Sequence, residues 1–215
     1  MTLVAVVHAT AAAMAPATAA FADEFPEARV RHLLDDTLIT DAERAGGLTP
    51  PLRARMRSLI GYALDSGADA VLLSCSMYGP VAEEFEAARP VLSSDAALFD
   101  EVVRRAPKRV HVLGPIEAGT RDTVDRLQAT VGAATAVYGS VVTGARDALA
   151  AGDTGRAARL VAETAARDVD LVLLGQFSLA PARDAAQERL AVPLLSPPHL
   201  AANALRSALG FPERT

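Results

Sequence analysis

Short apolar runs alternate with amphipathic segments along this chain. The runs are four to six residues long, rich in Val and Leu, and mostly unbroken by polar residues. Such runs are typical of strands that are covered on both faces. Between them, Thr49 followed by two prolines indicates a helix start, residues 52–63 carry apolar side chains on one helical face, and Gly67 is placed to end the helix. Strands that alternate with helices through short linkers predict right-handed crossovers and parallel sheets, which is an α/β fold.

The sequence also repeats itself once. Three segments recur in the same order, at offsets of 101, 103 and 106 residues: 69–75 with 170–176, 90–93 with 193–196, and 4–8 with 110–114. We therefore predict two pseudo-symmetric lobes, residues 1–107 and 108–215, each a short, mostly parallel sheet flanked by helices. The C-terminal helix could pack back on the first lobe. A pseudo-twofold axis would bring the carboxyl ends of the strands together in an active-site cleft, where open α/β sheets bind ligands.

Composition narrows the function classes. The 215 residues carry a net charge of −5 with scattered basic residues, which disfavours nucleic acid as a partner. Residues 2–22 are uncharged, but no Lys or Arg precedes them and polar residues and a proline interrupt them, so we expect neither a secretion signal nor a membrane segment. The single cysteine excludes an internal disulfide and a multi-cysteine metal site and fits a cytoplasmic protein. No metal-ligand spacing and no nucleotide-binding motif is present, so we expect no metal and no cofactor.

The predicted strand ends carry the candidate chemistry. Residues 8–10 and 74–80 follow strands of the first half, and residues 114–116 and 175–178 follow the equivalent strands of the second half. The repeat places Cys75 and Gln176 at matching positions. A lone cysteine is usually a small buried hydrophobic residue, but Cys75 closes a strand just before an expected helix start at Gly79-Pro80. Amides and the dipole at such a start favour a thiolate, so we expect Cys75 to be functional.

The other polar candidates leave alternatives open. His8 ends the first strand and is either a second acid or base of the cleft or a strand-end histidine bonded to backbone. The acidic pair that follows the next strand, Asp35-Asp36, either lines the cleft or caps a turn. The remaining candidates are expected to be structural or to face solvent: His32, His111 and His199 as structural residues, and Arg53, Arg55 and Arg57 on the solvent side of their helix.

The two-lobed repeat, the Leu-Leu-Ser-Cys-Ser strand end of the first half and the Leu-Leu-Gly-Gln-Phe-Ser-Leu-Ala strand end of the second resemble the aspartate/glutamate/hydantoin racemase superfamily. The resemblance covers essentially the whole chain. It implies an enzyme independent of pyridoxal phosphate, in which one cysteine from each half flanks the carbon next to a carboxylate. By that pattern Cys75 matches the first cysteine, and residues 8–10 match the loop that holds the substrate carboxylate. It also implies a homodimer.

The sequence departs from the racemase pattern at the second cysteine, which is replaced by Gln176, and in the usually hydroxyl-bearing loop at 114–116, although Thr120 follows nearby. Racemisation by two thiols is therefore not expected. Three hypotheses remain: an isomerase acting next to the carboxylate of a small acid, with Cys75 as acid/base or nucleophile; a decarboxylase or lyase that protonates a carbanion from Cys75; and a non-catalytic protein that binds small carboxylates. The expected substrate-binding residues are Thr10, Ser76, Gly114, Gln176 and Ser178, beside the catalytic candidates Cys75 and His8.

Overall fold

The computed structural model describes residues 2–212, which form two compact units. Of the described residues, one unit contains 2–96 together with 198–212, and the other is Ala97–Pro197. The change of unit thus falls before the lobe boundary expected at 107/108, and the last helix groups with the first unit. Both units are α/β, as the alternation of apolar and amphipathic segments predicted.

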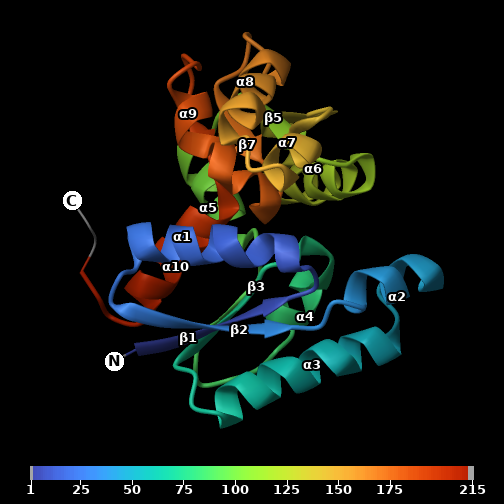
Figure 1. The fold of residues 1–215 in the computed structure, drawn as a ribbon, viewed down its shortest axis with the longest axis vertical. Coiled ribbons are helices and arrows are strands. Elements are labelled where there is room, and N and C mark those ends of the chain that lie inside the picture. Colours follow the sequence, from blue (N-terminus) through green and yellow to red (C-terminus); the bar gives the residue numbers. More distant parts are fainter. Residues whose placement is uncertain (1, 213–215) are drawn as a thin grey trace. The chain divides into compact units, whose positions relative to one another are not determined.

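The first unit is built on a parallel four-stranded sheet in the order β2-β1-β3-β4 (Figure 1). Its elements are β1 Thr2–His8, η1 Ala11–Ala13, α1 Met14–Glu24, β2 Ala28–Leu34, α2 Leu38–Ala45, α3 Pro50–Asp65, β3 Ala70–Leu73, η2 Ser76–Tyr78, α4 Gly79–Glu83, β4 Val91–Leu92 and α10 Pro197–Ala208. The uncharged N-terminal segment forms a central strand and most of α1. No helix within residues 2–212 is long and apolar enough to cross a membrane.

The second unit repeats this topology in the order β6-β5-β7-β8, again with parallel strands. Its elements are α5 Ala96–Arg105, β5 Arg109–Gly114, α6 Glu117–Val131, η3 Gly132–Ala134, β6 Ala136–Val141, α7 Ala145–Ala150, α8 Thr154–Thr164, β7 Leu171–Leu174, η4 Phe177–Ala182, α9 Arg183–Gln187 and β8 Leu194–Leu195. The three repeated segments found in the sequence form β1 and β5, β3 and β7, and β4 and β8. The predicted repeat is therefore confirmed, element by element.

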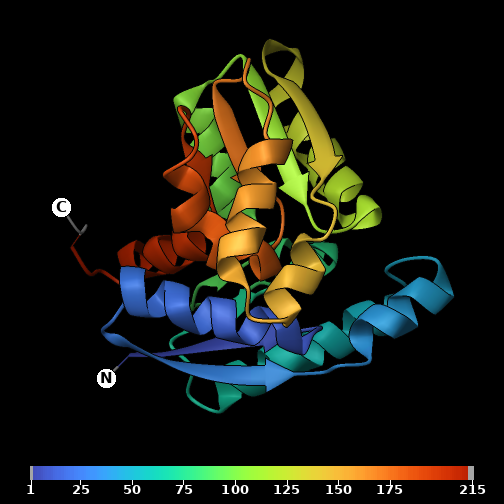
Figure 2. The same ribbon diagram turned by 45° about the horizontal axis from the view of Figure 1, so that its top comes forward.

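Burial explains why the central strands have unbroken apolar sequences. Every residue of β3 and of β7 is buried, because helices cover both faces of each sheet. In the first unit α1 lies on one face of the sheet and α3 on the other (Figures 1 and 2). Helix α3 buries Leu52, Met56, Ile60 and Ala63, the face expected from the sequence, although the side chain of Thr49 makes no capping hydrogen bond.

Side-chain alternation along β1 and β3 separates two environments at the carboxyl edge of the first sheet. Val7, Leu73 and Cys75 pack with the apolar core that includes α3 residues such as Met56. His8, which follows Val7, and Ser74, which lies between Leu73 and Cys75, belong to the other face, and a hydrogen bond joins their side chains. The thiol of Cys75 and the imidazole of His8 therefore lie on different faces of the sheet, at the ends of neighbouring strands.

Candidate functional site

Cys75 lies at the carboxyl end of a central strand, two residues after β3 ends at Leu73. Its backbone is extended, and its carbonyl accepts a hydrogen bond from the Tyr78 amide at 3.1 Å, which closes the short helix η2. The residue is partly exposed and packs against the apolar core. Helix α4 does begin at Gly79, as expected, but it is only five residues long and η2 separates it from Cys75. Any dipole effect on the thiol is therefore weaker than the sequence suggested.

His8 is fully buried, and both of its ring nitrogens contact side chains. Nδ1 lies 2.8 Å from Ser74 Oγ, and Nε2 lies 2.8 Å from His32 Nδ1. His32 Nε2 in turn lies 2.9 Å from Thr18 Oγ1 on α1. The alternative of a strand-end histidine bonded to backbone is thus wrong. Burial, and secondarily the nearby His32, lowers the pKa of His8 to about 4, so that its ring is neutral near pH 7.

The prediction that His32 is a structural residue did not include its contact with His8. His32 lies on β2, the edge strand that runs parallel to β1, and pairs in register with Val6. Its ring packs against His8 with the ring centroids 5.0 Å apart, and burial lowers its pKa as well. A signal was present, because His8 and His32 both lie in predicted strands, but the pairing register was needed to bring them together.

The expected carboxylate-binding residues of the first half lie in loops after adjacent strands. Thr10 follows β1, is exposed, and caps η1 by accepting the Ala12 amide at 3.4 Å. Ser76 follows Cys75 and is partly exposed. Because β1 and β3 pair directly up to Val7 and Leu73, these loops leave the same edge of the sheet. The structure therefore brings Thr10, Ser76 and Cys75 to one edge.

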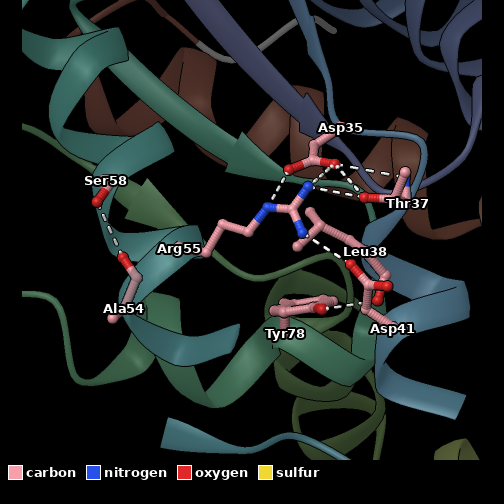
Figure 3. Close-up of polar contacts among 8 residues, drawn as sticks. All are labelled: Asp35, Thr37, Leu38, Asp41, Ala54, Arg55, Ser58 and Tyr78. Atoms are coloured by element: carbon pink, nitrogen blue, oxygen red, sulfur yellow. Dashed lines mark hydrogen bonds and ion pairs between the residues drawn. The ribbon is translucent and has the colours of Figure 1, made fainter. Parts of the chain in front are cut away.

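A charged cluster holds α2 against α3 near the Cys75 loop (Figure 3). The Arg55 guanidinium donates to Asp35 Oδ1 at 2.5 Å, to Thr37 Oγ1 at 2.7 Å and to Asp41 Oδ2 at 2.8 Å. Asp35 also accepts from the amide and hydroxyl of Thr37, which is the turn-capping alternative. The Arg55 side chain is 40% exposed, in line with the prediction that it faces solvent, but its guanidinium is also held between two carboxylates.

Tyr78 connects the Cys75 loop to the same α2 segment. Its hydroxyl donates to the Leu38 carbonyl at 3.0 Å, and its ring is fully buried (Figure 3). Burial, with a contribution from Cys75, raises the pKa of Tyr78 to about 12, so that the phenol stays protonated and keeps donating. The neighbouring arginines Arg53 and Arg57 both contact Glu84 at 3.1 Å and so tie α3 to the end of α4. The position of the Cys75 loop therefore depends on α2 and α3.

Gln176 occupies in the second sheet the place that Cys75 has in the first. It follows β7 with an extended backbone, precedes η4, and its carbonyl accepts from the Leu179 amide at 3.2 Å. Its amide lies against the first turn of α6, because a Cβ built on Gly119 would overlap Gln176 Nε2. Ser178 lies on η4 and is partly exposed. The glutamine side chain thus has a defined position on the second unit.

Gly114 ends β5 at the position equivalent to His8, and the structure explains why it lacks a side chain. A Cβ there would overlap Thr120 Oγ1, whose hydroxyl donates to the Ile116 carbonyl at 2.7 Å. The hydroxyl that lies next to this strand end is that of Thr120, in the first turn of α6. His111, expected to be structural, is buried between Ser140 Oγ at 2.9 Å and the Ala166 amide at 3.0 Å.

His199 is buried on α10, with Nε2 3.8 Å from Asp23 Oδ2 in the same unit. Among residues 2–212, no three His, Cys, Asp or Glu side chains are grouped as ligands of one metal ion would be. The cleft that would bring Cys75 opposite Gln176 stays a prediction.

The chain matches no protein-family model and no curated protein by sequence. Its fold, however, matches solved structures over nearly its whole length. An aspartate racemase from Picrophilus torridus superposes with a TM-score of 0.71 at 15% identity, covering 100% of this chain and 96% of that one. An allantoin racemase from Klebsiella pneumoniae gives 0.68 at 16% identity, covering 100% and 95%. A maleate isomerase from Pseudomonas putida S16, solved with maleate, gives 0.69 at 17% identity, covering 98% and 94%. The chain thus has the fold of the racemases and isomerases that it was found to resemble.

Proposed function

We propose that this protein is a cofactor-independent isomerase or racemase-like enzyme, which acts at the carbon next to a carboxylate of a small acid through Cys75. The observation that carries the proposal is the position of the chain's single cysteine, partly exposed at the carboxyl end of a central strand. Ligands of open α/β sheets bind at that edge. The fold supports the reaction class, because the solved structures that share it include amino-acid and allantoin racemases and a maleate isomerase.

One thiol on one side limits the chemistry. Gln176, at the place equivalent to Cys75, neither takes up nor releases a proton near neutral pH. A single thiolate suffices for cis–trans isomerisation of an unsaturated dicarboxylate. Its sulfur forms a bond to one alkene carbon, and the π electrons move onto the carboxylate of the neighbouring carbon. After rotation about the resulting single bond those electrons return, the C–S bond breaks, and the thiolate leaves unchanged.

The remaining candidates would stabilise the negative charge that develops on the substrate. The Gln176 amide and the hydroxyls of Thr10, Ser76 and Ser178 are hydrogen-bond donors, and Gly114 places backbone without a side chain at the end of β5. Donors that are already oriented toward a developing oxyanion are worth several kcal/mol, about 2.7–4 for one such group. We assign these residues to binding the carboxylate, and we assign bond making and breaking to Cys75.

A second candidate, decarboxylation, is favoured by the same single thiol. Loss of CO₂ from a malonate-type acid leaves a carbanion, and a thiol on one side returns a proton to one face only. This reaction consumes one solvent proton per turnover, whereas the isomerisation consumes none. In D₂O the decarboxylation therefore incorporates one deuterium into its product, whereas isomerisation by thiol addition incorporates none.

The experiment is a panel of small carboxylic acids in D₂O followed by ¹H NMR, with the wild type and the Cys75→Ala and Ser58→Ala variants compared. Ser58 is exposed on α3, so its replacement serves as a control. We expect turnover that falls by orders of magnitude in Cys75→Ala and is unchanged in Ser58→Ala. Isomerisation or α-proton exchange without loss of mass supports the isomerase, and CO₂ release supports the decarboxylase. Undiminished turnover in Cys75→Ala, or saturable binding with no turnover of any acid, would overturn the proposal.

A further inference from the structure

A continuous row of hydrogen-bonding groups crosses the α1 face of the first unit, from the carboxyl end of β3 to the surface of α1. It contains Ser74, His8, His32 and Thr18. Starting at the inner end, the contacts are Val7 O to Ser74 Oγ at 3.3 Å, Ser74 Oγ to His8 Nδ1 at 2.8 Å, His8 Nε2 to His32 Nδ1 at 2.8 Å, His32 Nε2 to Thr18 Oγ1 at 2.9 Å, and Thr18 Oγ1 to Met14 O at 3.1 Å. His8 and Ser74 are buried, His32 is partly buried and Thr18 is exposed.

Counting hydrogens shows that this row has two arrangements with the same number of hydrogen bonds. Each neutral imidazole contributes one N–H and each hydroxyl one O–H, so four hydrogens serve the five contacts. One contact therefore always lacks a hydrogen, and the three inner contacts keep theirs only if the missing one is at an end. Either Thr18 donates inward, so that every donor points toward Val7 O, or Ser74 donates outward, so that every donor points toward Met14 O.

The ends of the row tolerate either arrangement. The Val7 carbonyl already accepts the Ser74 amide at 3.0 Å, and the Met14 carbonyl belongs to the first turn of α1. Neither carbonyl is stranded when its hydroxyl turns away. Both rings also have to be neutral for the row to work, and burial, which lowers the pKa of His8 to about 4 and lowers that of His32, keeps them so near pH 7.

We propose that Ser74, His8, His32 and Thr18 form a proton relay, which connects solvent at α1 with the carboxyl edge of the first sheet. Passage of one proton inward is balanced at every step. The Ser74 hydroxyl proton leaves to the carbanion that forms next to the substrate carboxylate, and Ser74 takes the proton from His8 Nδ1. His8 Nε2 takes the proton from His32 Nδ1, His32 Nε2 takes the Thr18 proton, and Thr18 takes one from water. The row then points outward, and outward passage restores it.

The use of this relay rests on the proposed function. A reaction that removes and later returns a proton next to a carboxylate drives the relay once in each direction, so neither ring has to rotate. Because Ser74 and Cys75 belong to opposite faces of the strand end, the relay supplies a route separate from the thiol. It gives buried His8 an acid/base role that acts through Ser74.

The first test needs no substrate: ¹⁵N NMR of the imidazole nitrogens of His8 and His32. In the wild type we expect averaged shifts, between those of protonated and unprotonated nitrogens, at all four positions. Thr18→Val removes the outer hydroxyl and should fix both rings as Nδ1–H. Ser74→Ala removes the inner one and should fix both as Nε2–H. A single tautomer in the wild type, shared with one of these variants, would overturn the relay.

The second test measures deuterium exchange at the α-carbon of an acid that turns over. Thr18→Val should slow exchange on the order of 10²-fold, the lower end of what a positioned acid or base contributes, and Thr18→Ser should restore it. Thr130→Val is the matched control, because the exposed Thr130 makes the same hydroxyl contact one turn back along α6. Averaged tautomers with unchanged exchange in Thr18→Val, or turnover by thiol addition without any exchange at the α-carbon, would overturn the catalytic use of the relay. If no acid turns over, the proposed function fails while the ¹⁵N spectra still decide the relay.

Discussion

The contact between Gly119 and Gln176 allows a site residue to be displaced without being mutated. Gly119 is the third residue of α6, and a Cβ at this position would overlap Nε2 and lie 3.0 Å from Cδ of the Gln176 side chain. In Gly119→Ala the amide must therefore move. Because the obstacle is the far end of a flexible side chain, the backbone can stay in place.

Two opposing terms set the effect on stability. Alanine favours the helix over glycine by up to about 1 kcal/mol. Forcing the Gln176 side chain away from its rotamer costs about 0.5–1.5 kcal/mol. The free energy of unfolding should therefore stay within about 1 kcal/mol of wild type, which corresponds to a change in Tm of about 2–4 °C or less for a chain of this size.

The assay combines thermal unfolding, the ¹H–¹⁵N resonances of the Gln176 side-chain amide, and the turnover of an accepted acid. We expect a Tm within about 2–4 °C of wild type, a shifted amide resonance and turnover as low as that of Gln176→Ala. Gly155→Ala is the control, because it lies at the start of α8 where a Cβ would approach no atom closer than 3.8 Å. Wild-type turnover in Gly119→Ala combined with a loss in Gln176→Ala would refute the positioning argument.

Three further predictions concern stability. Gly114→Ala should lower the free energy of unfolding by about 1–3 kcal/mol, as overpacking does. The new Cβ would overlap the Thr120 side chain and lie 3.3 Å from the Thr120 Cα, and urea unfolding measures the loss. Arg55→Met should lower the free energy of unfolding by only about 1 kcal/mol, because solvent screens the partly exposed ion pairs, and it should speed hydrogen exchange of the α2 amides. Arg55→Lys should not restore this protection, because an ammonium group cannot replace the planar guanidinium that contacts two carboxylates at once. The folded state lowers the pKa of His8 from 6.5 to about 4, so His8 contributes stability that is complete above pH 6.5 and is lost as the pH falls toward 4, up to roughly 3 kcal/mol. Urea midpoints between pH 4.5 and 7.5 should depend less on pH in His8→Asn; an unchanged slope would contradict the assignment.

Strand identity and topology could be predicted because they follow from local pattern. The unbroken apolar runs before Cys75 and Gln176 need cover on both faces, and their repetition at matching spacing dictates matching places in two sheets. The strand-end position of Cys75 followed directly. The weaker dipole effect at Cys75 could not be predicted, because the short helix η2, residues 76–78, has no distinct sequence signal and separates Cys75 from α4.

Contacts across strands could not be predicted from the sequence alone. The His8–His32 contact depends on the register of β1 against β2 and on Thr18 facing the sheet from α1. Likewise, Arg55 faces solvent as expected, but its ion pair with Asp41 on α2, at 2.8 Å, could not be predicted from the helix pattern. In both cases a distant segment satisfied a polar group that looked free in the sequence.

The reactivity of the Cys75 thiol tests the central claim most directly. Because the chain has a single cysteine, the rate of iodoacetamide labelling, followed by mass spectrometry from pH 5 to 9, reports this residue alone. The account predicts labelling at pH 7 that is faster than for free cysteine and is blocked by saturating maleate or another small dicarboxylate. Labelling that is no faster than for free cysteine and is indifferent to every acid tested would contradict it.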